Sequence, residues 1–269
     1  MSTALDAIIT DLAAEQSALA RVLDSLSAGD WDVPTHAPGW SVRDQVSHLA
    51  FFNEAAARAI TDPEGFAAEV REFMQAGADA EARYLARGRG MAPGGVLGWW
   101  RTASSALIAA ARTLDPDVRV PWFGPAMSPA SFITARLMET WSHGLDVVDV
   151  VDADRPDTDR LRHVAFLGVR TRAYSYAARG MEQPAAPVRV ELTSPSGEKW
   201  ILGDAGAADV IRGTATDFCR VVTQRRHMAD TDLEIHGPAA EEWMAIAQAF
   251  AGPPGQGRRP GEFVEEKSV

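Results

Sequence analysis

The chain has 269 residues, and its 37 acidic and 26 basic side chains give a formal net charge of −11. Such a surface repels phosphate backbones, and no stretch of eighteen uncharged apolar residues occurs, so we expect neither nucleic-acid binding nor a membrane span. The one cysteine, Cys219, excludes an internal disulfide and is typical of the reducing cytoplasm, where we expect the protein.

The first 152 residues carry apolar side chains at helical spacing and no β alternation. Ser41 with Asp44 three positions later predicts a capped helix start, and Ser128 followed by Pro129 predicts another. Four long helices and one more polar helical segment predict an up-and-down bundle. The expected ranges are about 3–26, 41–62, 63–88 (the polar segment), 96–114 and 128–151.

The pattern changes after residues 152–156, which we interpret as a linker. Apolar and polar residues alternate on both sides of Pro195-Ser196-Gly197, which predicts a β-hairpin over 187–203. Further expected elements are helices over 157–180, from about 216 to 226 and over 238–250, and strands at 210–212 and 233–235.

The predicted fold is therefore a mainly α N-terminal four-helix bundle followed by a smaller C-terminal α+β domain. We place the bundle at residues 1–155 and the α+β domain at 156–251. Residues 252–269 are rich in Pro and Gly at their start and in charge at their end, so we expect a disordered tail.

Three side chains in the bundle predict a metal site. Glu139 and His143 lie four residues apart, on one face of a helix, and His48 lies on an earlier helix. A carboxylate in an apolar run needs a compensating charge, and two imidazoles with one carboxylate bind a divalent ion while leaving coordination positions open. The alternative is a hydrogen-bonded Glu–His pair at the solvent boundary, with His48 uninvolved. Asp44 and Asp146, each about one turn from a histidine, either orient the imidazoles or are solvated charges.

Two segments carry a family resemblance: residues 38–49, PGWSVRDQVSHL, and residues 139–146, ETWSHGLD. They resemble the DinB-like superfamily and, more closely, its mycothiol-dependent maleylpyruvate isomerase branch. The resemblance extends over residues 1 to about 250. It implies an N-terminal DinB-like metal-binding bundle joined to a C-terminal sterol-carrier-like domain.

The same resemblance implies roles for individual residues. The zinc ligands of the family fall on His48, Glu139 and His143. Arg225 and Arg226 fall where relatives carry an arginine that faces the thiol cofactor, although basic residues at the end of a helix are also favoured by the helix dipole.

We therefore expect a metal-dependent transferase or isomerase that uses a low-molecular-weight thiol of the mycothiol type and acts on a small-molecule electrophile. The expected ion is zinc, which would lower the pKa of a coordinated thiol from about 8.5 so that it reacts as a thiolate. Two alternatives remain open. The same three ligands suit a non-heme ferrous enzyme, and the bundle could instead be a non-catalytic, metal-stabilised ligand-binding protein.

Overall fold

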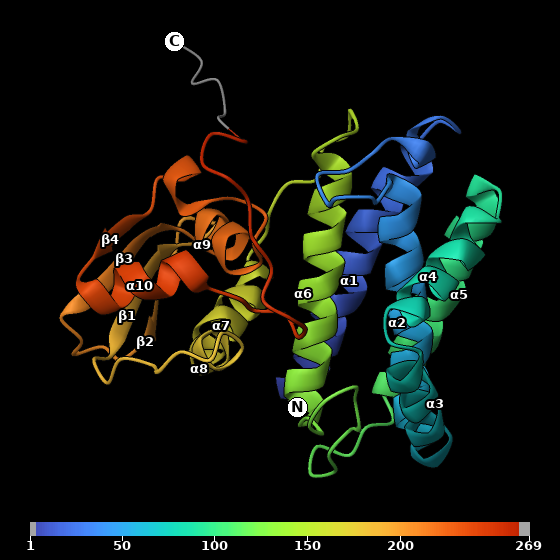
Figure 1. Cartoon of the computed structure of the whole chain (residues 1–269), viewed down its shortest axis with the longest axis horizontal. Coiled ribbons are helices and arrows are strands. Elements are labelled where there is room, and N and C mark those ends of the chain that lie inside the picture. The colour runs from blue at the N-terminus through green and yellow to red at the C-terminus, as the bar shows by residue number, and fades with distance from the viewer. Residues whose placement is uncertain (1–3, 264–269) are drawn as a thin grey trace. The chain divides into compact units, whose positions relative to one another are not determined.

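The computed structural model describes residues 4–263, and the chain divides into two compact units between Arg155 and Pro156. The first unit is helical, and the second combines helices with a small sheet (Figure 1). The predicted fold class, a helical bundle followed by a smaller α+β unit, is confirmed. None of the helices in the described part of the chain is long and apolar enough to cross a lipid bilayer.

Four long helices form the bundle: α1 (Ala4–Ser25), α2 (Val42–Thr61), α5 (Pro93–Ala111) and α6 (Pro129–Val148). Helix α1 packs along α6, α2 packs along α5, and α2 also contacts α6 (Figure 1). Their apolar faces close a core that includes Leu12, Leu19, Val46, Leu49, Leu107 and Ile133, each at most 1% exposed. Burial of these side chains fixes the rotation of α2 and α6, and therefore the direction in which their polar residues point.

The polar segment 63–88, expected as one helix, forms two: α3 (Pro63–Ala76) and α4 (Ala78–Arg89). The break is at Gly77, whose φ of 53° lies in the left-handed region that glycine adopts most readily. Helix α4 packs on α2 as a result. This packing brings Tyr84 to the part of α2 that carries His48.

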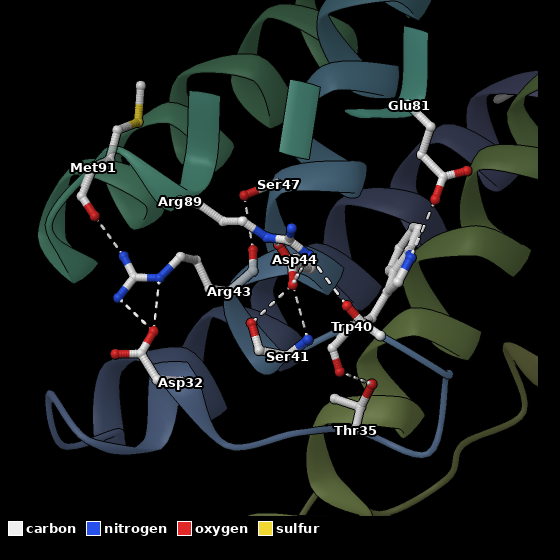
Figure 2. Close-up of polar contacts among 11 residues, drawn as sticks. Asp32, Thr35, Trp40, Ser41, Arg43, Asp44, Ser47, Glu81, Arg89 and Met91 are labelled. Carbon is white, nitrogen blue, oxygen red and sulfur yellow. Dashed lines mark hydrogen bonds and ion pairs between the residues drawn. The ribbon is translucent and has the colours of Figure 1, made fainter. Parts of the chain in front are cut away.

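The start of α2 is held by polar contacts from three parts of the chain (Figure 2). The Asp44 carboxylate accepts hydrogen bonds from the backbone N–H and the hydroxyl of Ser41, which confirms the predicted capped start. Asp44 also pairs with Arg89 at 2.9 Å, and Arg43 pairs with Asp32 at 2.9 Å. The short 3₁₀ helix Asp30–Asp32 and the end of α4 are thus tied to the first turn of α2.

The second unit has a four-stranded sheet in the order β2-β1-β3-β4. Strands β1 (Val188–Thr193) and β2 (Lys199–Gly203) form the predicted antiparallel hairpin. Strand β3 (Asp209–Thr214) runs parallel to β1, and β4 (Glu234–His236) pairs with β3 in the antiparallel sense.

The helices of this unit are α7 (Leu161–Arg170), α8 (Arg172–Ala177), α9 (Ala215–Val222) and α10 (Pro238–Ile246), with a 3₁₀ turn at Met228–Asp230. The helix expected over 157–180 is thus two helices, interrupted at Thr171, whose backbone leaves the helical region. Of the segment expected to be a disordered tail, residues 264–269 lie outside the described residues. Before them, Gly261 donates its N–H to Asp230 and Phe263 lies 3.8 Å from the Arg226 guanidinium.

Candidate metal centre

The bundle brings His48, Glu139 and His143 together. Each offers one ligand atom, and the three atoms lie within 4.8 Å of one another. Oε2 of Glu139 is 3.0 Å from Nε2 of His143 and 3.7 Å from Nε2 of His48, and the two imidazole centroids are 4.2 Å apart. The three side chains are 12–16% exposed. The trio is therefore almost enclosed but keeps contact with the outside.

The protonation of His143 follows from a chain of hydrogen bonds. The Thr35 hydroxyl donates to the carbonyl oxygen of Trp40 and accepts from the side-chain amide N–H of Gln45, both at 2.9 Å. The amide oxygen of Gln45 is thereby turned toward Nδ1 of His143, at 2.6 Å. An amide oxygen only accepts, so Nδ1 carries a proton and the imidazole presents Nε2 to Glu139.

A positive charge between His143 and Glu139 would complete this arrangement. Nε2 of a neutral His143 has a lone pair, and it faces Oε2 of Glu139, which is also an acceptor, at 3.0 Å. Two acceptors at this distance repel unless a positive charge lies between them. A second proton on His143 is one solution, and a divalent ion bound by both atoms is the other. The donor set of two imidazole nitrogens and one carboxylate oxygen fits the divalent ion.

His48 has a hydrogen-bonding partner on the far side of its ring. Nδ1 lies 3.2 Å from the hydroxyl of Tyr84, so the ring presents Nε2 to the trio, as His143 does. Burial, followed by the proximity of His143, lowers the pKa of His48 to about 4. At neutral pH this imidazole is uncharged and available as a ligand.

Glu139 is the anion of the site. Burial raises its pKa, but the neighbouring side chains of His143 and His48 and the nearby Arg136 charge outweigh that effect and hold the pKa well below its usual range. The carboxylate is therefore ionised. Arg136 lies one turn earlier on α6, with Nη2 3.7 Å from Oε1 of Glu139.

Aromatic rings surround the trio. The ring of Trp40 lies 5.3 Å from His48 and is stacked on His143 at 6.0 Å, and Phe52 lies 4.6 Å from His48. Phe52 belongs to a larger aromatic cluster that also contains Phe51, Phe66, Phe73, Tyr84, Trp122, Phe123 and Phe132. Water is largely excluded from such surroundings, which strengthens electrostatic interactions at the site.

The sequence leaves Asp44 and Asp146 as either residues that orient the imidazoles or solvated charges, and the second alternative is wrong, because both side chains are buried. Asp44 pairs with Ser41 and Arg89 rather than with His48. Asp146 is 3.8 Å from Nδ1 of His143, farther away than the amide oxygen of Gln45. Both positions lie near the histidines in sequence, but the hydrogen bonds come from Gln45 and Tyr84.

Gln45, Tyr84 and Arg136 were missed in the sequence. Gln45 has a signal in hindsight, because it lies three residues before His48 and therefore on nearly the same face of α2. Tyr84 has no such signal, because it reaches the site from α4.

Arg225 and Arg226 lie in the second unit, beyond the end of α9 at Val222 rather than on the last turn of a helix. The chain turns at Gln224, whose φ is 58°. Arg225 donates to the carbonyl oxygen of Thr223 at 2.8 Å, and Arg226 is buried. Because Thr223 is the C-cap residue of α9, this contact fits the helix-dipole explanation for Arg225. Contact with a thiol remains a prediction.

A cavity of about 540 Å³ lies at the start of α2, lined by Asp32, Pro34, Gly39, Trp40, Ser41, Arg43, Asp44 and Arg89. Figure 2 shows that its charged groups are paired with each other, Arg43 with Asp32 and Arg89 with Asp44. Trp40, which donates to Glu81, borders both this cavity and the trio.

The family model described as the mycothiol maleylpyruvate isomerase N-terminal domain matches residues 12–148, a range that includes all three members of the trio. The chain belongs to this family. The predicted family resemblance is thus confirmed.

A second comparison finds a relative that is similar over most of the chain. An uncharacterized protein of Mycobacterium tuberculosis, found in strains CDC 1551 / Oshkosh and ATCC 25618 / H37Rv, is 44% identical over 257 residues. The match covers 93% of this chain and 97% of that protein.

Two solved structures share the fold. Both are of a mycothiol-dependent maleylpyruvate isomerase, one of them a histidine-to-alanine mutant. The mutant matches with a TM-score of 0.61 at 18% identity, and the other with 0.59 at 16%. Each match covers 88% of this chain and 96% of the solved chain, so the likeness includes both units.

Proposed function

We propose that this protein is a metal- and thiol-dependent enzyme, an isomerase or S-transferase that uses a mycothiol-type thiol and acts on a small-molecule electrophile. The divalent ion, for which zinc is the best fit, would be held by His48, Glu139 and His143. When bound, it would stabilise the thiolate form of a thiol at neutral pH. Membership of the family supports the thiol, and the donor set supports the metal.

The observation that carries the metal is the pair of acceptors on His143. Gln45 fixes the proton on Nδ1, and Glu139 faces the other ring nitrogen at 3.0 Å. A neutral histidine with a structural role would ordinarily donate one hydrogen bond through one ring nitrogen and accept one at the other. This one is directed by its surroundings to present a lone pair beside a carboxylate, as a metal ligand does.

The chain's own residues have separate tasks in this proposal. Gln45 and Tyr84 hold the imidazoles with Nε2 directed to a common point. Glu139 supplies the negative charge that a divalent ion requires. Trp40 and Phe52 cover the imidazoles and limit the access of water.

The metal proposal is tested by purifying the protein without an affinity tag and measuring its metal content by elemental mass spectrometry. We expect about one equivalent of zinc in the natural protein and less than about a tenth in the His48→Ala variant. The matched control is His236→Ala, because His236 is exposed on β4 and its loss should leave the zinc content unchanged. A protein without stoichiometric divalent metal would overturn the proposal, and one equivalent of oxygen-sensitive iron would favour the ferrous alternative.

The thiol is tested separately, by calorimetry on the zinc-loaded protein. Mycothiol and its S-methyl derivative share every group except the ionisable S–H. We expect mycothiol to bind at least about tenfold more tightly than the thioether at pH 7.5, and this preference to disappear in His48→Ala. Equal affinity for the two compounds would contradict thiolate binding, whatever the zinc content.

A further inference from the structure

The guanidinium of Arg136 is a buried cation without a hydrogen bond to any residue that the structure describes. Its side chain is 5% exposed, and Nη1 is fully enclosed with no acceptor. The nearest carboxylate oxygen, Oε1 of Glu139, is 3.7 Å from Nη2, which exceeds the length of a hydrogen bond. A guanidinium offers five N–H donors and stays charged in proteins, so this group lacks the acceptors it requires.

The surroundings of Arg136 provide attraction without acceptors. Its guanidinium carbon lies 5.0 Å from the ring centroid of Trp122 and 6.0 Å from that of Phe52. Aromatic faces attract a cation but do not satisfy its N–H groups as a carbonyl or carboxylate would. The cost of burying unsatisfied charged donors is high, and a bound ligand that accepts from them removes that cost.

Glu139 does not supply the hydrogen-bond acceptors that the Arg136 guanidinium lacks. Its other oxygen, Oε2, faces His143 at 3.0 Å and His48 at 3.7 Å, so the carboxylate is directed to the trio. In the proposed function the charge of Glu139 is shared with the metal ion, which weakens the attraction to Arg136 further. A buried positive charge then lies one helical turn from the reacting centre.

We propose that Arg136 is the anion-recognising residue of this site and binds a carboxylate of the electrophile. The planar guanidinium matches a carboxylate, which can accept two parallel N–H bonds from it. Phe52 and Trp122 flank the guanidinium and would contact the carbon skeleton next to that carboxylate. The inference rests on the proposed function, and it assigns to Arg136 the recognition of the substrate's negative charge.

The test uses succinate, an unreactive dicarboxylate, and succinamide, which has the same shape without the charge. Binding of each is measured by calorimetry to the zinc-loaded and to the metal-free natural protein and its variants. Arg136→Gln removes the charge, and Arg136→Lys keeps the charge but loses the planar fork. Arg101→Gln is the matched control, because Arg101 pairs with Asp24 on the exposed surface of the bundle.

We expect the natural protein and Arg101→Gln to bind succinate and not succinamide. Affinity for succinate should fall at least about tenfold in Arg136→Gln and by less in Arg136→Lys. Unchanged affinity in Arg136→Gln, or equal binding of succinamide, would overturn the inference. So would a loss of mycothiol affinity as large as the loss of succinate affinity, because the anion bound by Arg136 would then be the thiolate.

The two proposals fail in different measurements. A protein without zinc that still binds succinate through Arg136 retains this inference and loses the proposed metal. A protein that binds zinc and mycothiol normally, with succinate affinity independent of Arg136, retains the proposed function and loses this inference. If Arg136→Gln does not fold, as judged by circular dichroism, Arg136→Lys decides, because a loss of succinate affinity with zinc content intact still supports carboxylate binding.

Discussion

The side-chain oxygen of Gln45, on α2, lies 2.6 Å from Nδ1 of His143, on α6, although 98 residues separate them. One helix therefore determines which nitrogen of a histidine on another helix is free to bind an ion. The Thr35 hydroxyl, which accepts from the Gln45 amide, prevents that amide from presenting its N–H instead. In the proposed function, a residue that does not contact the metal thus prepares a ligand for it.

Substitution of this glutamine should weaken metal binding. In Gln45→Leu, Nδ1 of His143 loses its acceptor, the tautomer is no longer fixed, and we expect zinc affinity to fall about 10–100-fold. The affinity is measured by competition with a chromogenic chelator. Gln45→Glu is the control, because it keeps an acceptor at that position and should lose less. Unchanged affinity in Gln45→Leu would refute the role assigned to Gln45.

Substitution of Tyr84 should weaken zinc binding less than substitution of Gln45 does. Tyr84→Phe removes the hydroxyl that lies 3.2 Å from Nδ1 of His48 but keeps the ring, which is stacked 4.8 Å from Phe51. Because solvent or the opposite tautomer can partly replace a hydroxyl, we expect a loss of zinc affinity of about tenfold or less. The same chelator competition measures it, and a loss greater than that of Gln45→Leu would contradict this ranking.

Asp44 should matter for stability and not for the metal. Asp44→Ala removes the cap of α2 and the partner of Arg89, so the free energy of unfolding should fall by about 2 kcal/mol. Urea unfolding measures this loss. Asp24→Ala, which breaks a half-exposed pair with Arg101, should cost less than about 1 kcal/mol. Zinc affinity of Asp44→Ala should stay within about threefold of the natural value, whereas a larger loss would restore Asp44 as a residue that orients His48.

The single cysteine should be unreactive in the folded protein. Burial, followed by the nearby charge of Asp157, raises the pKa of the Cys219 thiol well above its usual range. A raised pKa means that the thiol stays protonated at pH 8, where an exposed cysteine is partly thiolate. We expect negligible modification by iodoacetamide at pH 8 in native protein and complete modification in urea. Rapid labelling of the native protein would make Cys219 a candidate nucleophile in place of the external thiol.

Removal of the metal should leave the bundle folded. The buried apolar cluster of the bundle, which includes Leu19, Val46 and Trp100, contains none of the three proposed ligands, so its packing does not depend on an ion. Protein dialysed against a chelator should keep its helical circular dichroism and a cooperative thermal transition, as should His48→Ala. Loss of cooperative unfolding in both samples would instead favour the alternative in which the metal is structural.

Features that depend on short stretches of chain could be predicted from the sequence. Helical spacing placed Glu139 and His143 on one face of α6, and Ser41 with Asp44 marked the start of α2, because each of these pairs lies within one turn. The alternation around the turn at 195–197 predicted the β1–β2 hairpin for the same reason. The break of the polar segment at Gly77 was not predicted, because an isolated glycine within a helical pattern is often tolerated.

The sequence by itself determined the fold class, the family and the three side chains of the candidate metal centre, since these follow from local periodicity and from two short motifs. Only the tertiary structure decided which atoms those side chains present. That choice depends on Gln45 and Tyr84, which reach the histidines because α2, α4 and α6 pack together. A polar side chain takes whichever partner the packing of the apolar core places within about 3 Å, and no spacing along the chain specifies that partner.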